Sequence, residues 1–462
     1  MKKEIGSVKR SHNHAYILSI CFIASLGGFM FGFDLGIIGG VIPYIEHQFE
    51  LFGFWLGLVV AIFELGAMIG ALGTSRIADV FGRKRAMLAC ALLLTITAIG
   101  VATSGGSVSL AFWRLAQGIC VGAASVLSPM YIAEVAPPEI RGKLVSLNQL
   151  TIILGILIAS CYNYYFGSND LGSMGWRYMF LSALVPSLLF LLLLFFIPES
   201  PRWMISRSGN EEEANRILMR INNGDENRTH KEIGEIRNAF SDGNVRTKTS
   251  FRDLFKKRFL PIILIGFGIA SLQQLCGINN VTPYMQKIFI MAGVKLTDGL
   301  FNAVMVQLVF FLSTFIAIVL IDKIGRRFLM LAGTGLMAFS LICLALVFQL
   351  EIPGGIFVLV LMMIYIGSFG FTLGPVVWVL ISEMFPTEIR GKAIAMTSAV
   401  LWLATFIIVF VSPWLLNIGA STNFMVFGIL NILGFIFCYK YLPETKGKTL
   451  EQMKEIWQKQ RV

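Results

Sequence analysis

The chain has 462 residues, of which 56% are hydrophobic and only 14% are charged, and its mean hydropathy is +0.74. This composition excludes an ordinary water-soluble globular protein and is typical of a protein with many membrane spans. The net charge of +11 does not indicate nucleic-acid binding, because all but four of the 38 Lys and Arg residues lie at the termini or in alternate loops between apolar segments. Basic loops stay in the cytoplasm, so the charge predicts that both termini and the middle loop are cytoplasmic.

A membrane-spanning helix needs about 20 apolar residues, and the sequence contains twelve candidates. We therefore predict an all-α membrane protein with twelve transmembrane helices. In chain order the candidates lie near residues 15–40, 55–75, 86–104, 110–133, 144–166, 176–197, 259–291, 300–321, 329–350, 355–382, 393–416 and 423–442.

Three short motifs occur twice, with nearly equal offsets of 243, 249 and 245 residues. Such a parallel duplication is typical of one large class of secondary transporters, so we predict two six-helix pseudo-repeat bundles. Helical spacing of apolar residues in the polar middle segment predicts short cytoplasmic linker helices, with a regulatory docking site as the alternative. The predicted units are a first bundle at 1–198, linker helices at 199–257, a second bundle at 258–442 and a tail at 443–462, with room for an amphipathic helix near 450–457.

The repeated motifs place acids and arginines at the predicted cytoplasmic ends of the spans. Partly shielded pairs attract more strongly than exposed ion pairs, which contribute about 0–1 kcal/mol. Pairs that form only when this side is shut would bias a two-state equilibrium. A basic turn following the charge rule would explain one copy, but two copies with matching acids favour a gate. Its predicted members are Asp79, Arg83, Glu134, Arg141, Glu199, Asp322, Arg326, Glu383, Arg390 and Glu444.

Asp34 lies in the middle of the first apolar span. A charge near the bilayer centre costs several kcal/mol, so this acid needs a partner, a water path or a proton. Arg114, early in the fourth span, is the other charge that we expect to reach Asp34 within the first half. A fixed structural ion pair and a proton-binding site both fit this pattern.

The seventh span carries four amide side chains within eight residues: Gln273, Gln274, Asn279 and Asn280. Amides donate and accept hydrogen bonds, as sugar hydroxyls do, and a polar group without a partner is costly in an apolar helix. Hydrogen bonding between helices is the alternative for individual members. The seven cysteines all fall in apolar spans without metal-like spacing, so we expect no metal site. The four histidines lie near the termini and in loops with no acid cluster around them, so we expect no enzyme site, and we expect no cofactor.

Five motifs together resemble the signatures of the sugar porter family of the major facilitator superfamily, in order and over essentially the whole chain. They are Gly82-Arg83-Lys84, Arg141-Gly142-Lys143, the segment from Pro198-Glu199-Ser200 to Trp203, the segment from Gln273-Gln274 to Asn279, and Pro443-Glu444-Thr445. The resemblance implies two bundles that rock about a central cavity.

The same resemblance implies a bacterial-type sugar–proton symporter in which Asp34 accepts the proton and Arg114 tunes it. It also implies that Gln149 supplies an amide from the first bundle and that Trp378 stacks on the sugar ring. We expect Phe31, one turn before Asp34, to line the same space.

Several positions depart from the family pattern and predict a less polar pocket in the second half. A site without partners for particular hydroxyls favours substrates that lack them, so the sugar stays open, with a slight preference for a hexose from Ile156. The departing residues are Pro283, Phe310, Leu373, Leu401 and Thr405.

We therefore expect proton-coupled uptake of a hexose or pentose by a monomer in the cell membrane, with sugar, proton and lipid bilayer as its partners and no nucleic acid. A facilitative uniporter, a polyol symporter of the inositol type and a non-transporting sugar sensor are the alternatives.

Overall fold

The computed structural model describes residues 12–137, 140–169, 171–241, 254–352, 355–385, 389–444 and 446; the side chains of 75, 173, 239–241, 319–322, 382–383 and 390–391 are not described. Within these ranges the elements are helical, and twelve helices are long and apolar enough to cross a membrane. The predicted all-α fold with twelve spans is confirmed. The tail helix predicted near 450–457 lies outside the described residues.

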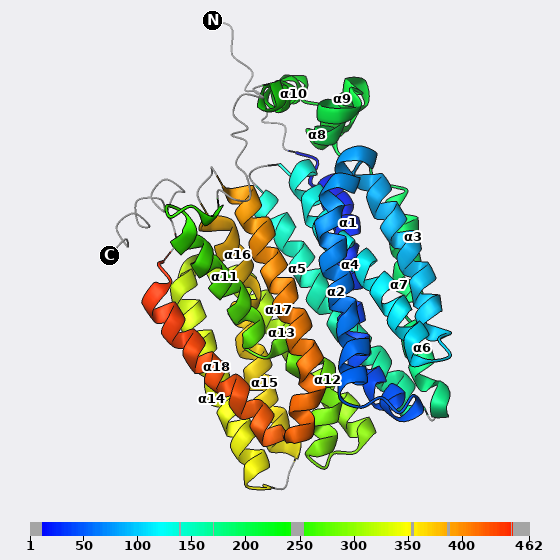
Figure 1. The fold of residues 1–462 in the computed structure, drawn as a ribbon. Coiled ribbons are helices and arrows are strands. Elements are labelled where there is room, and N and C mark those ends of the chain that lie inside the picture. Colours follow the sequence, from blue (N-terminus) through cyan, green and yellow to red (C-terminus); the bar gives the residue numbers. More distant parts are fainter. Residues whose placement is uncertain are drawn as a thin grey trace, which may run out of the picture.

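The first six spans form one half of the molecule (Figure 1). They are α1 (His14–Gln48), α2 (Phe54–Phe81), α3 (Arg83–Ala102), α4 (Ser107–Val135), α5 (Arg141–Ser168) and the consecutive pair α6 (Gly175–Leu181) and α7 (Leu184–Leu194), preceded by the short η1 (Gly172–Met174).

The last six spans form the other half, in which two spans are interrupted. They are α11 (Leu260–Leu275) with α12 (Ile278–Met291), α13 (Leu296–Ile324), α14 (Arg326–Gln349), α15 (Gly355–Phe371) with α16 (Leu373–Glu383), α17 (Arg390–Ile418) and α18 (Ala420–Tyr441). The sequence pattern predicted each interrupted span as one continuous segment, because no charged residue marks either break.

Four short elements connect the halves and project beyond one end of the spans, which we call the linker end; the opposite end is the far end (Figure 1). Amphipathic helices were predicted here, and α9 buries Ile217, Leu218 and Ile221 while its Asn210 cap accepts a hydrogen bond from the Glu213 amide. The elements are α8 (Pro201–Trp203), η2 (Met204–Ser208), α9 (Glu211–Ile221) and α10 (Glu226–Ser241).

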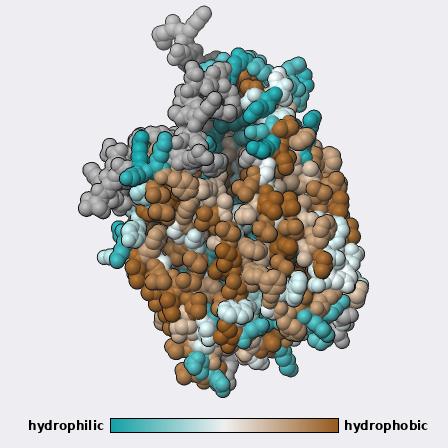
Figure 2. Space-filling view, viewed as in Figure 1, coloured by the Kyte–Doolittle hydropathy of each residue, from teal (hydrophilic) through white to brown (hydrophobic). Residues whose placement is uncertain are grey.

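Hydrophobic residues cover the middle of the molecular face in Figure 2, whereas hydrophilic residues gather toward both ends. Such a belt suits a bilayer, because hydrocarbon cannot solvate charged side chains.

The first half is held together by backbone contact at glycines. A Cβ on Gly32 of α1 would lie 1.8 Å from the carbonyl oxygen of Ile152 on α5. Similarly, a Cβ on Gly118 of α4 would lie 2.1 Å from the carbonyl oxygen of Phe63 on α2. Only glycine permits helices to approach this closely, so α1, α2, α4 and α5 have fixed positions. Asp34 is two residues beyond Gly32, and its place follows from this packing.

Candidate functional site

The first half buries an ion pair between two helices. A terminal guanidinium nitrogen of Arg114 on α4 lies 2.7 Å from Oδ2 of Asp34 on α1, and the two residues are only 1% and 2% exposed. The guanidinium also lies 4.4 Å from the ring centroid of Phe63 and donates to Gln117 at 3.3 Å. The sequence predicted both charges inside membrane spans, and the packing of α1 on α4 brings their side chains together. If one of the two charges were removed, the other would stay buried without a partner, which is strongly destabilising.

A third ionisable residue, Glu64 on α2, belongs to the same buried cluster and was missed by the sequence analysis. It is 3% exposed, and it follows Phe63, whose ring centroid lies 4.4 Å from the Arg114 guanidinium. The signal was available, because Glu64 is an acid in the middle of an apolar span, as Asp34 is.

The second half brings its two helix interruptions together. At the α11–α12 break, the carbonyl oxygen of Cys276 accepts hydrogen bonds from the Tyr365 hydroxyl at 2.9 Å and the Asn431 amide at 3.0 Å. Nε2 of Gln273 lies 3.2 Å from the carbonyl oxygens of Leu373 and Gly374, where α16 begins. A break inside a membrane protein leaves backbone groups that need partners, and these side chains supply them.

Three of the predicted sugar-binding amides form a chain beside these breaks. The Gln274 amide donates to Oε1 of Gln273 at 3.4 Å, and the Asn279 amide donates to Oε1 of Gln274 at 2.5 Å. Gln274 and Asn279 thus lie on either side of the break and retain further capacity for hydrogen bonds.

Asn280 occupies a different place and requires a correction. Its amide donates to Ser412 on α17 at 2.7 Å and to Asn423 on α18 at 3.1 Å, and Asn423 donates back at 2.9 Å. The side chain is fully buried. The structure therefore gives Asn280 the helix-packing role that was the alternative for individual amides, and it does not support a sugar contact. One residue along a helix turns a side chain by about 100°, which separates Asn280 from Asn279.

The remaining predicted sugar contacts come from three further helices. Gln149 on α5 is half-buried. Trp378 on α16 is 40% exposed. The ring of Phe31 on α1 contacts Trp402 on α17, with 5.6 Å between centroids. Trp402, which was not predicted as a site residue, therefore joins the halves near Asp34.

The departures from the family pattern are buried, and all of them except Thr405 are apolar. Phe310 packs on Phe369 with 5.9 Å between ring centroids, and the Thr405 hydroxyl donates to the Leu401 carbonyl of its own helix at 2.9 Å. These positions offer no free polar atom to a ligand.

Other polar groups that sequence analysis missed lie on α12. Thr282 and Gln286 are buried, and Oγ1 and Oε1 respectively have no hydrogen-bond partner among the described residues. With Asn279 they follow a spacing of three and four residues, which places them on one helix face. That spacing was readable in the sequence.

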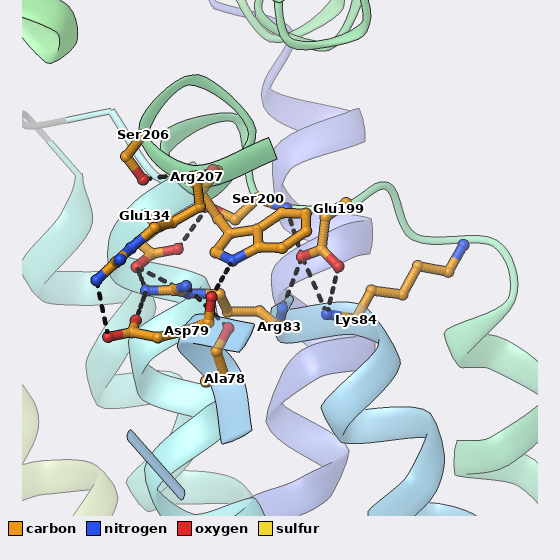
Figure 3. Close-up of polar contacts among 10 residues, drawn as sticks. Ala78, Asp79, Arg83, Lys84, Glu134, Glu199, Ser200, Ser206 and Arg207 are labelled. Atoms are coloured by element: carbon orange, nitrogen blue, oxygen red, sulfur yellow. Dashed lines mark hydrogen bonds and ion pairs between the residues drawn. The ribbon is translucent and has the colours of Figure 1, made fainter. Parts of the chain in front are cut away.

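At the linker end, the first copy of the repeated motif forms a charged cluster (Figure 3). Arg83 lies 2.9 Å from Oε1 of Glu134 and 3.4 Å from Asp79. Arg207 of η2 lies 3.6 Å from Asp79 and was not predicted. Arg141 donates to the carbonyl oxygen of Ala136 at 3.3 Å, so it lies at the end of α4.

Glu199 caps the helix that follows the Gly-Arg turn. Its Oε1 accepts from the backbone amides of Arg83 at 2.9 Å and Lys84 at 3.0 Å (Figure 3). Gly82 has φ of 93°, a conformation that favours glycine. A carboxylate at a helix N-terminus satisfies open amides and complements the helix dipole.

The second half repeats this cap. Glu444 accepts from the backbone amides of Arg326 and Arg327, each at 3.0 Å, after Gly325 with φ of 103°. The two copies of the motif are thus similar in structure as well as in sequence. The side chains of Asp322, Glu383 and Arg390 lie outside the described residues.

At the far end, side chains of the two halves meet. Nζ of Lys287 on α12 lies 2.8 Å from Oε1 of Glu46 on α1, with 18% and 22% of these side chains exposed. The rings of Tyr164 on α5 and Phe301 on α13 lie 5.7 Å apart. The halves are thus joined at this end by an ion pair and by ring contact.

Comparisons with known proteins agree over nearly the whole chain. The profile of the family described as "Sugar (and other) transporter" matches residues 20–457. The chain is 38% identical to the glucose transport protein of Synechocystis sp. over 96% of this chain and 97% of that protein, and 36% identical to the D-xylose-proton symporter of Escherichia coli over 97% of each. The solved inward-open conformation of the xylose transporter XylE from E. coli is similar with a TM-score of 0.84 and 34% identity, covering 96% of this chain and 100% of that one.

Proposed function

Because the chain belongs to the sugar transporter family, we propose that it is a proton-coupled symporter that moves a monosaccharide, a hexose or a pentose, into the cell by alternating access. It is a transporter and not an enzyme. The observation that carries the proposal is the buried Asp34–Arg114 ion pair. Protonation of Asp34 would break this pair and thereby link the conformation of the carrier to proton binding. The relatives' names, one a glucose transport protein and one a D-xylose-proton symporter, support it.

The pair couples the proton to the sugar as follows. Ionised Asp34 holds Arg114, and removing one charge from a buried pair costs about 3–5 kcal/mol. A proton that arrives from outside neutralises Asp34 and frees the guanidinium, and this state binds sugar. The loaded carrier then opens inward and releases sugar and proton. The membrane potential contributes about 2.3 kcal/mol per charge for each 100 mV.

The sugar-binding groups come from both halves. Gln149 supplies an amide from the first half, and Gln274 and Asn279 supply theirs at the helix breaks of the second half. Gln273 lies beside them, although its amide also bonds to the carbonyls of Leu373 and Gly374. Trp378 stacks on the sugar ring. Phe31 reaches the same region from α1, where it contacts Trp402. Asn280 is left out because its amide is bound to Asn423.

We assign the linker end to the cytoplasm, since basic residues gather in its loops and at both termini. The contacts at the far end then close the outer side, which corresponds to an inward-facing state and fits the similarity to inward-open XylE. We place the protein in the cell membrane as a monomer whose halves, 1–198 and 258–442, move about the linker 199–257 and carry the tail 443–462.

In this proposal the linker-end contacts act within each half, because they are formed although the inner side is open. Arg83, Glu134 and Asp79 hold the ends of α2, α3 and α4 together, and Glu199 and Glu444 fix the matching turns in the two halves. Each half can therefore move as a unit when the inner side opens or shuts.

The test uses purified protein in vesicles and a panel of labelled hexoses, pentoses and polyols. Counterflow without a proton gradient identifies the substrate, and an imposed inward proton gradient should then drive its accumulation. A protonophore should remove accumulation and leave counterflow. Uptake that the protonophore does not change would establish the uniporter, and transport of polyols alone would establish the polyol symporter.

A further inference from the structure

The mechanism above leaves Glu64 without a role, although it is a buried acid inside the charged cluster. Its Oε2 has no hydrogen-bond partner among the described residues, and the residue is 3% exposed. The backbone contact between Phe63 and Gly118 holds this turn of α2 against α4. Arg114 lies one turn before Gly118, and its guanidinium lies 4.4 Å from the ring centroid of Phe63, the residue that precedes Glu64.

The cluster contains two acids and one cation. Arg114 is bound to Oδ2 of Asp34, while Oδ1 of Asp34, Nε of Arg114 and Oε2 of Glu64 have no hydrogen-bond partner in the described part of the chain. If both acids were ionised, one negative charge would be buried without compensation, which is strongly disfavoured. With Asp34 paired to Arg114, Glu64 must therefore carry a proton.

No other charge in the neighbouring spans can take this role. On α17, which packs along α2, the charged residues are Arg390 and Lys392 in its first turn; on α3 they are likewise confined to its first turn. The charged partners left for Glu64 in the middle of the described spans are thus Asp34 on α1 and Arg114 on α4, whose guanidinium lies against the Phe63 ring.

We propose that Glu64 is a second proton-binding residue of the transport cycle, and that Arg114 exchanges Asp34 for Glu64 when Asp34 takes up a proton. This inference rests on the proposed proton coupling. A proton from outside binds Asp34, the guanidinium turns to Glu64, and Glu64 releases its own proton toward the cytoplasm. The proton on Asp34 then passes to Glu64, and Arg114 returns to Asp34.

One proton enters and one leaves in each cycle, and the resting forms of the cluster always contain one guanidinium, one carboxylate and one proton. The exchange therefore avoids an isolated buried charge in both resting forms. A single acid beside Arg114 would leave the cation without a partner whenever that acid was protonated.

The experiment compares proton-driven accumulation with counterflow in vesicles, using the best substrate of the sugar panel. The variants are Glu64→Gln, Glu64→Asp, Asp34→Asn, the double variant Asp34→Asn/Glu64→Gln, and Glu351→Gln as a control that removes an exposed far-end carboxylate. Proton-driven accumulation by the unaltered protein is measured first. If it is absent, the proposed symport fails, independently of the role of Glu64.

Given accumulation by the unaltered protein, Glu64→Gln should lower it by about tenfold, a usual size for coupling between two sites, while counterflow persists. Glu64→Asp keeps a carboxylate and should recover most of the loss. Asp34→Asn removes the carboxylate that receives the outside proton, so this variant and the double variant should both lose accumulation. Accumulation by Glu64→Gln equal to that of the control would overturn the inference.

Infrared spectra of the unaltered protein and of the Glu64 variants, compared as difference spectra, provide a readout that does not depend on transport. A protonated carboxyl group has a C=O stretching band that a carboxylate lacks. The unaltered protein should show this band at neutral pH, and the band should shift in Glu64→Asp and disappear in Glu64→Gln. A spectrum in which the Glu64 substitutions change no such band would exclude a protonated Glu64.

Discussion

The first half holds its charges between continuous helices in backbone contact, whereas the second half holds its amides beside two helix interruptions. Gly32 and Gly118 bring the helices around Asp34 and Arg114 into backbone contact, so the pair lies in closely packed surroundings. In the second half, Gln273 bonds to backbone carbonyls that the break at α16 leaves open. A buried charge is thus held where helices pack closely, while an uncharged ligand site can be built on irregular backbone.

The ends of the halves are alike despite this difference. Glu199 and Glu444 cap equivalent helices after glycines of positive φ. We therefore relate the duplicated turns to the movement of the bundles. The features that differ between the halves, the ion pair and the amides, relate to the proton and the sugar. The following substitutions test these differences and similarities between the two halves.

The largest effect is expected from adding one methyl group to the α1–α5 contact. In Gly32→Ala the new Cβ would lie 1.8 Å from the Ile152 carbonyl oxygen, so the helices must separate, with a loss of about 3 kcal/mol or more. Gly335→Ala in α14 is the matched control, since its nearest neighbours lie at 3.8 Å. Thermal unfolding in detergent should show a large decrease for the first variant alone. Equal melting temperatures would contradict the claim that the first half depends on backbone contact.

A pair of amide substitutions separates ligand binding from helix packing in the second half. Gln274→Leu removes an amide of the chain beside the break and should weaken sugar binding by about tenfold, since an unpaired polar contact costs about 1–3 kcal/mol. Asn280→Leu breaks the bonds to Asn423 and Ser412 and should lower the melting temperature instead. Counterflow half-saturation and thermal unfolding of both variants measure the two effects. A loss of sugar affinity in Asn280→Leu would restore it to the binding site.

The matching caps should contribute equally to stability. Glu199→Ala and Glu444→Ala each leave two backbone amides without their carboxylate, which should cost about 1 kcal/mol. The two losses should add in the double variant, because the caps lie in different halves. Thermal unfolding checks this. If one of the two substitutions leaves the melting temperature unchanged, the caps are similar in geometry but not in their contribution to stability.

The smallest effect is expected where the halves meet at the far end. Glu46→Gln removes the ion pair with Lys287, a partly exposed pair that we expect to contribute about 1 kcal/mol. The outward-facing population should rise a few-fold. Spin labels at the exposed Glu50 and Lys295 would report the distance between α1 and α13. In the Lys287→Met background, Glu46→Gln should change nothing further; an additional change would show that Glu46 acts through another partner.

The sequence predicted the site unevenly, and the reason differs from residue to residue. Asp34 and Arg114 stood out because a charge in a span is rare and costly. Glu64 obeys the same rule and was readable. Asn280 was misassigned because composition cannot tell which face of a helix an amide occupies, and the face is set by the neighbours Ser412 and Asn423.

The amino-acid sequence by itself determined the number of spans, the duplication and the repeated acidic and basic motifs, since hydrocarbon imposes length and apolarity on every span. The tertiary structure alone decided which polar groups meet. Asp34 and Arg114 are 80 residues apart, and Gln273 lies 100 residues from the carbonyl of Leu373 that it binds. Such contacts depend on how closely helices approach, and glycine contacts and helix breaks fix that distance only when the whole bundle is assembled.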